Sequence, residues 1–370
     1  MTQRKLHNLI LFLVALASWI IPKKSGKVII FPLHTPEKIQ GHLRSLLLAN
    51  SSLNILRDLR AITFSPPSLE PATFLKYTIW LLNYAWDLLR AEILIIDSVR
   101  SSLGIGRFSF VQTWHGTGFK NIGLLVRGYG YMKILRYRRI GKMTRLAIAS
   151  CEADKKRKID ALNLRDALVL GSPRLDGLTI LKNKPKKPAN LSILYAPTYR
   201  SENIAPSLLT QEDWLNKLDL LLSKIDGRLY VRLHPLDRCH LDFSSYSRIF
   251  DASYAEIDGM QILSKTDILI SDFSSIVTDF SILNRPIIWF VPDLDEYTNR
   301  HRNFYYDFPN ILPGPLCFDI DCLLEKLEDR SWFNEENYQR EFANFVALFH
   351  ARLDGRASER VLYETASLVD

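Results

Sequence analysis

The sequence predicts an α/β protein made of two Rossmann-like domains, each with a parallel sheet, that face a cleft. The length of 370 residues exceeds that of one typical domain. Short apolar runs alternate with helical patterns, which is typical of βαβ units. A basic stretch with two prolines, from Lys182 to Pro188, interrupts this alternation and is the best linker in the chain. We therefore expect four segments: an apolar and basic N-terminal segment 1–25, a first domain 26–181, a linker 182–190, and a second domain with terminal helices 191–370.

The first half contains the strand and helix patterns of one such domain. Helices are expected where apolar residues recur at helical spacing, and strands where short apolar runs end in polar or proline-containing turns. The predicted strands are 27–33, 59–64, 93–97, 108–113, 146–150 and 167–170, and the predicted helices are 36–48, 73–90 and 151–162.

The second half repeats the alternation. The predicted strands are 191–195, 228–233, 246–250, 267–270 and 286–291. The predicted helices are 211–222, 258–263 and 274–283, followed by a mostly helical tail that includes 335–349 and 358–368. Two successive sets of parallel-strand patterns indicate two sheets rather than one.

The N-terminus contains an apolar run from Leu9 to Ile21, with basic residues on both sides. The run is shorter than the roughly 20 residues that a membrane-spanning helix requires. No small-residue cleavage site follows it, which argues against a secretion signal. We expect an interfacial membrane anchor with Trp19 at the boundary, and a buried first helix is the alternative.

The composition is that of a globular protein, with 47% hydrophobic and 24% charged residues. The net charge of +8 favours anionic partners such as nucleotides, polyphosphates, nucleic acid or a lipid surface. None of the four cysteines forms a C-x-x-C pair, and the spacing of Cys317 and Cys322 matches no zinc motif. The interpretation is four reduced thiols in a cytosolic compartment.

A basic segment from Lys120 to Arg145 contains no Asp or Glu. Aliphatic and aromatic residues separate its cations, a pattern that suits an anionic membrane surface or a polyanionic substrate. A solvated helix face is the alternative. The residues predicted to face such a surface or substrate are Lys120, Arg127, Lys133, Arg136, Arg138 and Arg139.

Two histidines follow predicted strands in different halves of the chain. His115 lies in the stretch QTWHGTGFK after the strand 108–113, and His234 follows the strand 228–233. Ligands of open α/β sheets bind at the carboxyl edge of the strands. A lone histidine there is ordinarily structural, but two at equivalent edges of facing domains can converge. A neutral imidazole can take a proton from an attacking hydroxyl, and a cationic one can stabilise a phosphate.

Two further elements predict phosphate binding. Ser271, Asp272, Ser274 and Ser275 follow a strand and open a helix, where backbone N–H groups and hydroxyls suit an anion. Helix capping by Asp272 or Ser274 is the simpler alternative. Arg200 lies just past another strand end and can clamp phosphate oxygens.

Neither a metal site nor a cofactor is predicted. The chain has no H-E-x-x-H, Walker A or G-x-G-x-x-G motif. We therefore expect a metal-independent transfer in which basic groups and helix dipoles take the place of a cation.

The ordered set of these stretches resembles the CDP-glycerol:glycerophosphotransferase family of teichoic-acid polymerases and primases. The matching stretches cover roughly 108–365: Gln112 to Gly123, Gly171 to Asp176, Leu194 to Arg200, Arg232 to Leu236, Ile270 to Tyr297, Asp307 to Leu316 and Phe349 to Val361. Any one of these stretches is weak evidence for the family, whereas the whole set in this order is specific to it.

This resemblance implies a metal-independent GT-B fold in which the C-terminal domain holds the nucleotide. It implies attack of an acceptor hydroxyl on the β-phosphorus of CDP-glycerol, with release of CMP. His115 would be the general base, His234 a second essential histidine near the phosphates, and the serine-rich stretch from Ser271 to Ser275 the phosphate pocket. The family acts at the cytoplasmic face of the membrane on a lipid-linked acceptor.

The sequence departs from the family pattern at three positions. Gly118 stands where proline is usual, Phe119 where leucine is common, and Phe273 where tyrosine is frequent. These changes leave both histidines in place and are expected to reshape the acceptor side, which Gly118 is predicted to face. The donor is therefore CDP-glycerol, CDP-ribitol or another CDP-polyol, and the acceptor a lipid-linked chain or another surface glycan. Two alternatives stay open: a GT-B glycosyltransferase that uses a nucleotide sugar, and a basic nucleic-acid-binding protein. The second would leave both histidine edges unexplained, so no nucleic-acid partner is expected.

Overall fold

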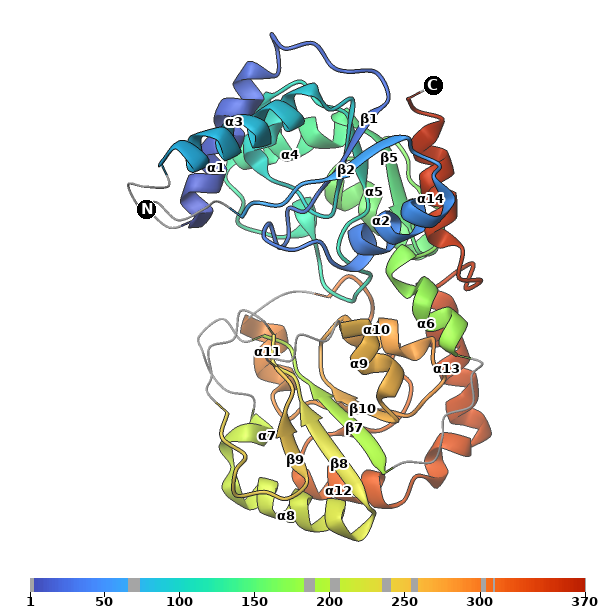
Figure 1. Ribbon diagram of the computed structural model, residues 1–370. Helices are drawn as coiled ribbons and strands as arrows, with labels where there is room; N and C mark the ends of the chain where they lie inside the picture. The colour runs from blue at the N-terminus through green and yellow to red at the C-terminus, as the bar shows by residue number, and fades with distance from the viewer. Residues whose placement is uncertain are drawn as a thin grey trace. The chain divides into compact units, whose positions relative to one another are not determined.

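The chain forms two compact units, each built on one parallel sheet of six strands (Figure 1). The structure is a computed structural model that describes residues 3–65, 74–182, 190–199, 207–234, 241–253, 259–300, 304–308 and 310–369. Unit 1 comprises Met1–Gly116, Asn121–Asp176 and His350–Asp370, and unit 2 comprises Thr117–Lys120 and Gly177–Phe349. The predicted pair of parallel sheets is confirmed.

The sheet of unit 1 has the strand order β2-β1-β3-β4-β5-β6. Its strands are β1 (Lys27–Phe31), β2 (Asp58–Ala61), β3 (Ile93–Ile96), β4 (Phe110–Gln112), β5 (Thr144–Ala149) and β6 (Leu168–Val169). The order reverses between β1 and β3, because β2 lies on one side of β1 and every later strand lies on the other. Each strand end predicted from the sequence lies within a few residues of the observed one.

Helices cover both faces of this sheet. Successive residues of β1 point to opposite sides: Ile29 and Phe31 belong to one apolar cluster, and Val28 and Ile30 to the other. The first cluster packs under α1 (Gln3–Ala17), α3 (Phe74–Arg90), α4 (Tyr131–Met143) and α5 (Glu152–Leu162). The second packs under α2 (Gly41–Leu53) and α14 (Ala357–Ala366). Short 3₁₀ turns complete the unit: η2 (Ser101–Ile105), η3 (Gly123–Leu125) and η4 (Pro173–Leu175).

The last helix, α14, belongs to unit 1, whereas the predicted boundaries placed all of 191–370 in the second domain. The Asp176 carboxylate accepts hydrogen bonds from the backbone N–H of Ala357 (3.0 Å) and of Ser358 (2.8 Å), and so caps the helix. Arg360 donates from Nε to the Leu170 carbonyl at 2.8 Å. An amphipathic pattern predicts that a helix has a buried face, but not which sheet that face covers.

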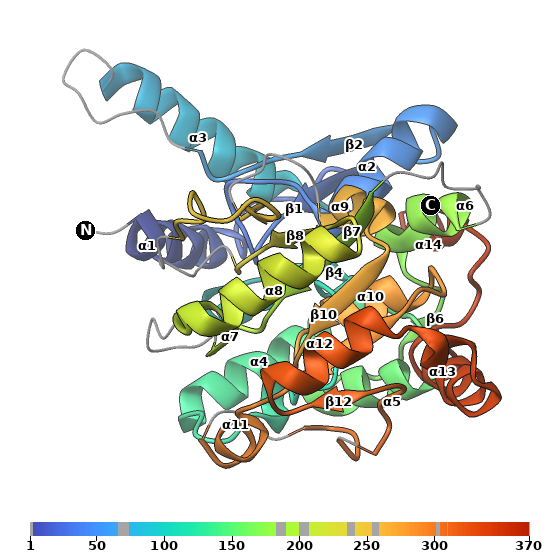
Figure 2. The same ribbon diagram turned by 90° about the horizontal axis from the view of Figure 1, so that it is seen from below.

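The sheet of unit 2 has the order β12-β11-β10-β7-β8-β9. Its strands are β7 (Leu191–Ala196), β8 (Gly227–Val231), β9 (Ile249–Asp251), β10 (Ile268–Ser271), β11 (Ile287–Phe290) and β12 (Leu316–Cys317). The order reverses between β7 and β10. The helices are α6 (Asp176–Leu181), which begins at the unit boundary, α7 (Ser207–Thr210), α8 (Glu212–Lys224), α9 (Gly259–Lys265), α10 (Ile276–Ser281), α11 (Leu294–Arg300), α12 (Ile320–Glu328), η5 (Ser331–Asn334) and α13 (Glu336–Phe349). Helices α8 and α12 lie side by side along this sheet (Figure 2).

A four-residue segment from the first half of the chain is built into unit 2. Phe119 is fully buried among the rings of Trp289, Phe308, Phe345 and Phe349. Its carbonyl accepts a hydrogen bond from the Tyr305 N–H at 2.7 Å. The stretch QTWHGTGFK is thus divided, with His115 in unit 1 and Phe119 in unit 2.

The N-terminal run forms a helix with one buried face, which agrees in part with the buried-helix alternative, and the membrane anchor stays a prediction. One face of α1, with Leu11 and Val14, is buried in the core of unit 1, whereas Leu9, Leu13 and Leu16 on the other face are about half exposed. Trp19 and Ile20 beyond the helix are also exposed. Within the described residues, none of the helices is both long and apolar enough to cross a bilayer.

The cysteine prediction is wrong for one pair, because Cys317 and Cys322 form a disulfide. Cys317 ends β12 and Cys322 lies in the first turn of α12, and this strand-to-helix turn brings their Cα atoms to 5.4 Å. Cys151 is a buried free thiol that accepts a hydrogen bond from the Asp154 N–H at the start of α5. Cys239, Arg200 and positions 183–189 of the predicted linker lie outside the described residues.

The buried His7 predicts a loss of stability in acid. Its Nε2 lies 2.8 Å from the Tyr84 hydroxyl, and burial, with Arg100 nearby, lowers the pKa of His7 from 6.5 to about 4. The unfolded chain therefore binds a proton in the window from about 6.5 down to about 4 that the folded chain does not. We expect the free energy of unfolding to fall by up to about 3 kcal/mol across this window. Urea denaturation at several pH values checks this for wild type and for His7→Gln, whose side chain does not titrate. The free energy of unfolding of the variant should depend less steeply on pH between 6.5 and about 4 than that of wild type. An equally steep dependence in both proteins would contradict the assignment.

Candidate active site

The first group of site residues lies at the carboxyl edge of the unit 1 sheet, where the strand order reverses. His34 lies three residues beyond β1, Asp97 immediately follows β3, and His115 lies three residues beyond β4. Because β1, β3 and β4 are neighbours in the sheet, their ends bring the three residues together. Such a reversal point is the preferred ligand site of open α/β sheets.

Asp97 holds this edge together through its side chain and its backbone. Its carboxylate accepts hydrogen bonds from the backbone N–H of Leu33 (2.7 Å) and of His34 (2.9 Å). Burial raises the pKa of the Asp97 carboxyl, although these two hydrogen bonds oppose the shift. The Asp97 carbonyl lies 3.2 Å from Nδ1 of His115.

This contact fixes the tautomer of His115. A carbonyl oxygen only accepts, so Nδ1 of His115 carries the hydrogen and Nε2 keeps the lone pair. Burial and the neighbouring His34 lower the pKa of His115 well below 6.5, so the ring is neutral near pH 7. The His115 ring stacks on His34 at a centroid distance of 4.3 Å and an interplanar angle of 12°. The arrangement presents an oriented, uncharged imidazole with a basic Nε2.

The turn that carries His115 is held in an unusual backbone conformation. Trp114 has φ of +60°, which side chains with a Cβ seldom adopt. Its N–H donates to the Gln112 side chain at 2.8 Å, and the Thr113 hydroxyl donates to the Ile96 carbonyl at 3.1 Å. The Arg174 guanidinium donates to the His115 carbonyl. Gly116 has φ of +155°, which favours glycine, and a Cβ there would also displace this guanidinium, which would lie 2.6 Å away.

A third histidine, His42, contacts the backbone of Arg174 and so helps to position it. It is buried at the start of α2, and its Nδ1 accepts a hydrogen bond from the Arg174 N–H at 3.3 Å. Burial and the positive charge of Arg174 hold the pKa of His42 well below its usual value. The sequence prediction named none of His34, His42, Asp97 or Arg174 as a site residue. The available signals were that His34 follows the predicted strand 27–33, that Asp97 ends the predicted strand 93–97, and that Arg174 lies in the matched stretch GSPRLD.

The second group lies at the carboxyl edge of the unit 2 sheet, also where the strand order reverses. The Asp272 carboxylate, just after β10, accepts a hydrogen bond from the Thr198 N–H, just after β7, at 2.7 Å. His234 follows the neighbouring β8, and its ring lies 5.5 Å from that of Tyr199. His234 belongs to unit 2 and His115 to unit 1, so their convergence stays a prediction.

The four residues of the predicted phosphate stretch divide into two roles. Ser271 and Asp272 are buried, and the Ser271 hydroxyl donates to the Ala196 carbonyl at 2.6 Å. These two side chains therefore tie β10 to β7 and position the loop. Ser274 is half-buried and Ser275 is exposed. The Ile276 N–H donates to the Ser274 hydroxyl at 3.5 Å at the start of α10, as the capping alternative expects of Ser274, whereas Ser275 makes no side-chain capping bond. These two hydroxyls are the ones that face solvent.

Two residues predicted to face the acceptor or the membrane lie in unit 2 instead. Lys120 has its ammonium 3.5 Å from the Thr198 hydroxyl and 5.1 Å from the centre of the Tyr297 ring. Gly118 lies against the serine loop, where a Cβ would be only 2.8 Å from Cβ of Ser275. Both residues belong to the segment 117–120, which the Thr278 hydroxyl anchors by donating to the Thr117 carbonyl at 2.7 Å. Gly118 therefore contacts the loop that carries Ser274 and Ser275. The prediction instead linked the replacement of proline by Gly118 to the acceptor side.

A substitution at Gly118 tests this contact. In Gly118→Ala the added Cβ must displace Ser275, and overpacking of this kind costs about 1 to 3 kcal/mol. We expect CDP-glycerol, measured by calorimetry, to bind about tenfold more weakly. Gly177→Ala is the matched control, because no atom lies within 4 Å of its added Cβ. Unchanged binding in Gly118→Ala would show that the position of Ser275 does not matter to the donor.

The remaining predicted cations stay in unit 1, on and before α4. Arg127, Lys133, Arg138 and Arg139 are exposed, and Arg136 is half-buried. The Arg139 guanidinium lies 5.3 Å from the centre of the Trp19 ring, next to the end of α1. The basic side chains of α4 and the apolar N-terminal run are thus neighbours in space.

Two helices of unit 1 expose apolar side chains at helical spacing. On α3 the exposed residues are Leu75, Ile79, Leu82 and Trp86, and on α1 they are Leu9, Phe12, Leu13 and Leu16. Helices α1 and α3 contact each other. Exposed apolar side chains gathered on one face are more typical of interaction surfaces than of isolated surface positions. The sequence prediction covered the stripe on α1 but not the one on α3, because it interpreted the apolar residues of α3 only as a helix signal.

The comparisons with known proteins agree with this architecture. The profile of the CDP-glycerol:poly(glycerophosphate) glycerophosphotransferase family matches residues 45–365. The teichoic acid ribitol-phosphate primase of Bacillus spizizenii is 30% identical over 278 residues, which are 68% of this chain and 67% of that protein. The teichoic acid glycerol-phosphate primase of Bacillus subtilis is 30% identical over 275 residues, 70% of this chain and 68% of that protein. The chain spans only about half (48%) of the poly(ribitol-phosphate) polymerase of B. spizizenii, at 28% identity over 76% of this chain.

Solved structures show the same fold. The wall teichoic acid polymerase TagF superimposes with a TM-score of 0.73 at 21% identity, covering 94% of this chain and 88% of that chain. A UDP-N-acetylglucosamine 2-epimerase from Listeria monocytogenes superimposes with a TM-score of 0.53 at 13% identity, covering 93% and 97%. The GT-B-like fold is therefore confirmed. The extent of the profile match and the identity to the primases together show that this chain is a transferase of the CDP-glycerol:poly(glycerophosphate) glycerophosphotransferase family.

Proposed function

We propose that this protein is a membrane-associated transferase that moves glycerol phosphate or a similar polyol phosphate from a CDP-activated donor to a hydroxyl of a lipid-linked or glycan acceptor, in the synthesis of a teichoic-acid-like surface polymer. The observation that carries the proposal is the neutral, oriented imidazole of His115 at the reversal point of the unit 1 sheet. Membership of the glycerophosphotransferase family supports the same reaction.

In the proposed step, Nε2 of His115 takes the proton of the acceptor hydroxyl. The acceptor oxygen then forms a bond to the β-phosphorus of the donor, the bond between that phosphorus and the bridging oxygen breaks, and CMP leaves with the electron pair. The imidazolium that forms is held by the Asp97 carbonyl at Nδ1. Because burial disfavours the charged ring, the proton is readily given up afterwards.

The donor is proposed to bind at the reversal point of the unit 2 sheet. Ser274 and Ser275 offer hydroxyls and backbone N–H groups to the phosphates, and the buried Asp272 holds the loop in place. His234 and Arg200 are proposed to contact the phosphates as well. The reaction needs no bound metal in this proposal, so chelation by EDTA should leave turnover unchanged.

The membrane is proposed as the working surface, at its cytoplasmic face. The exposed apolar stripes of α1 and α3 would enter the interfacial region, while the cations of α4 approach anionic head groups. A lipid-linked acceptor would then meet His115 in unit 1. The named relatives include both ribitol-phosphate and glycerol-phosphate enzymes, so either polyol is a candidate donor.

One assay tests the reaction class. The protein is incubated with a lipid-linked acceptor and either CDP-glycerol, CDP-ribitol or UDP-sugars, and the released nucleotide is measured. Release of CMP that depends on the acceptor supports the proposal. Release of UDP from a nucleotide sugar, without CMP from either CDP-polyol, would favour a glycosyltransferase. Salt-sensitive binding of arbitrary nucleic acid, unaffected by CDP-polyols, would favour the nucleic-acid alternative.

A further inference from the structure

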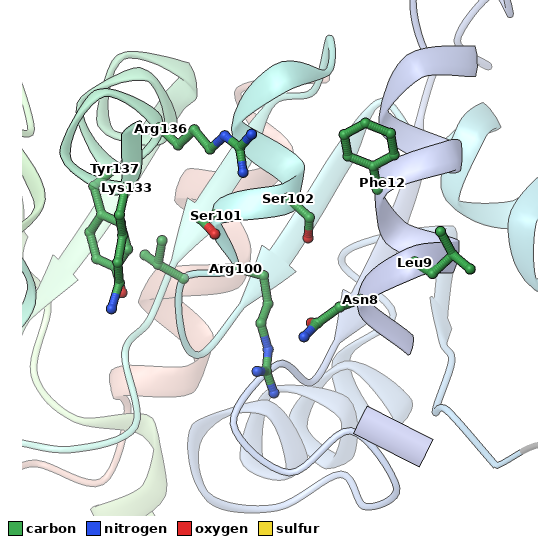
Figure 3. A pocket seen from close by; sticks show the side chains of 10 residues that line it. Asn8, Leu9, Phe12, Arg100, Ser101, Ser102, Lys133, Arg136 and Tyr137 are labelled. Carbon is green, nitrogen blue, oxygen red and sulfur yellow. The ribbon is translucent and has the colours of Figure 1, made fainter. Parts of the chain in front are cut away.

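A pocket of about 480 Å³ lies within unit 1, and His34, Asp97 and His115 are not among its lining residues (Figure 3). Its walls come from α1, from the segment 99–102 that leads into η2, and from α4. Its volume is within the usual range for sites of small ligands. The lining is cationic on one side, with Arg100, Lys133 and Arg136, and apolar on the α1 side, with Leu9 and Phe12.

Close packing of η2 against both helices fixes the shape of the pocket. A Cβ at Gly104 would lie 2.8 Å from the Arg136 carbonyl, so α4 approaches η2 as closely as glycine allows. A Cβ at Gly106 would lie 3.0 Å from Cα of Ala15 on the other side. The cations of α4 and the apolar side chains of α1 are therefore held at a fixed separation rather than on mobile surfaces.

Two polar atoms of the pocket lining lack a protein partner. Nε of Arg136 and Oγ of Ser102 are buried from solvent, and within the described residues neither makes a hydrogen bond. An unsatisfied buried polar group costs about 1 to 3 kcal/mol. Figure 3 shows both side chains between α4 and α1. A ligand with acceptor oxygens in the pocket would satisfy them.

The charge and the surroundings define the ligand. Three cations, without a carboxylate among the lining residues, favour an anion with several oxygens, as a phosphate group has. Leu9 and Phe12 line the pocket and are also part of the exposed apolar face of α1. On the α4 side, Met132 is exposed next to Lys133. An anion that carries an apolar chain fits this combination better than a free anion.

We propose that this pocket binds the phosphate head group of an anionic lipid, with Arg136 and Ser102 as its central donors. The inference rests on the proposed membrane association and gives it a specific site. In this arrangement Arg100 is fixed by donation of a hydrogen bond from Nη2 to the Leu33 carbonyl at 2.8 Å, next to His34 in the sequence. The Arg100 side chain thus lines the proposed lipid site and also contacts the backbone beside His34.

The test uses the full chain and a soluble lipid, dihexanoyl phosphatidylglycerol kept below its micelle concentration. Binding is measured by calorimetry for wild type, Arg136→Gln and Ser102→Ala. We expect each variant to bind about tenfold more weakly, because each loses a hydrogen bond to a charged group. Ser102→Ala removes a hydroxyl that bonds to no described protein group, so folding should be unaffected and unfolding temperatures verify this. Arg138→Gln is the matched control for the monomeric lipid: Arg138 is exposed on α4 but does not line the pocket, so its loss should change this affinity less than about twofold, whatever it contributes at an extended membrane surface.

Two further arms separate the possible outcomes. Inorganic phosphate should compete only weakly, and competition as strong as that of the soluble lipid would overturn the lipid as ligand. Equal loss in Arg136→Gln and Arg138→Gln would overturn the pocket and leave a diffuse basic surface. Flotation with vesicles of phosphatidylcholine containing phosphatidylglycerol then distinguishes the two proposals. If wild type floats and Arg136→Gln floats equally well, the membrane association survives without the pocket, whereas failure of wild type to float removes the membrane association itself.

Discussion

Replacement of His115 by alanine should reduce turnover by about 10²- to 10⁴-fold, the usual contribution of a general base. The reason is that the Asp97 carbonyl accepts the hydrogen of Nδ1, so Nε2 of His115 carries the lone pair that takes the acceptor's proton. His115→Asn should be equally impaired, since its amide can donate to the same carbonyl but cannot take a proton. CMP release from CDP-glycerol, measured at saturating donor, gives the effect on kcat.

Donor binding provides the control for this experiment, because the proposed donor residues belong to unit 2. Both variants should bind CDP-glycerol with nearly wild-type affinity and unfold at the wild-type temperature. Substantial CMP release by His115→Ala in the presence of acceptor would remove His115 from the role of base.

The pH dependence gives a second readout of the same group. The base must be neutral, and the pKa of His115 is held below 6.5 by burial and by His34. The acid limb of kcat/KM should therefore lie below pH 6.5, with activity lost as the pH falls through it. His34→Ala removes the stacked neighbour and should move this limb to higher pH, which a merely structural role for His34 would not do.

Loss of the apolar stripe on α3 should release the protein from membranes. In the double variant Ile79→Ser and Leu82→Ser, two exposed side chains no longer gain from burial in the interface. At roughly half the value of full burial each, the loss is about 2 kcal/mol, or about thirtyfold in the partition coefficient. Flotation with vesicles that contain anionic lipid measures it.

Leu220→Ser is the matched control, because this leucine is also exposed but lies on α8 of unit 2. It should partition like wild type. Equal partitioning of the double variant and wild type would exclude the α3 stripe as the membrane surface. Deletion of the N-terminal segment is not a clean test of anchoring, because Leu11 and Val14 of α1 are part of the core of unit 1.

The sequence was sufficient for every strand except β12, and for the position of His115 and His234 after their strands, because a buried parallel strand is a short apolar run whatever its neighbours are. The two residues of β12 are too short a run to give such a signal. The sequence was not sufficient for the sheet order. The order places the end of β1 beside the end of β3, and this adjacency brings His34 and Asp97 to His115. Adjacency of strands depends on long-range pairing, which leaves no local pattern.

The same limit explains why the predicted boundaries placed Gly118 and Lys120 in the first domain, whereas the structure places them in unit 2. Gly118 and Lys120 follow His115 in a continuous motif, and nothing in the sequence marks the point where the chain leaves one unit for the other. The signal lies in Phe119, whose aromatic partners all come from the second half of the chain. The buried Phe119 ring and the hydrogen bond from the Thr278 hydroxyl to the Thr117 carbonyl both tie the segment to unit 2.

The exchange of segments between the units has a consequence for any attempt to treat this chain as modular. Residues 177–349 alone would leave an unfilled hole where Phe119 packs, and residues 1–176 alone would leave the sheet face under α14 open to water. A functional half from a relative would have to be grafted as separate pieces of chain, including the four residues 117–120. The two structural units are therefore built from segments that alternate along the chain, and the stretch QTWHGTGFK contributes residues to both.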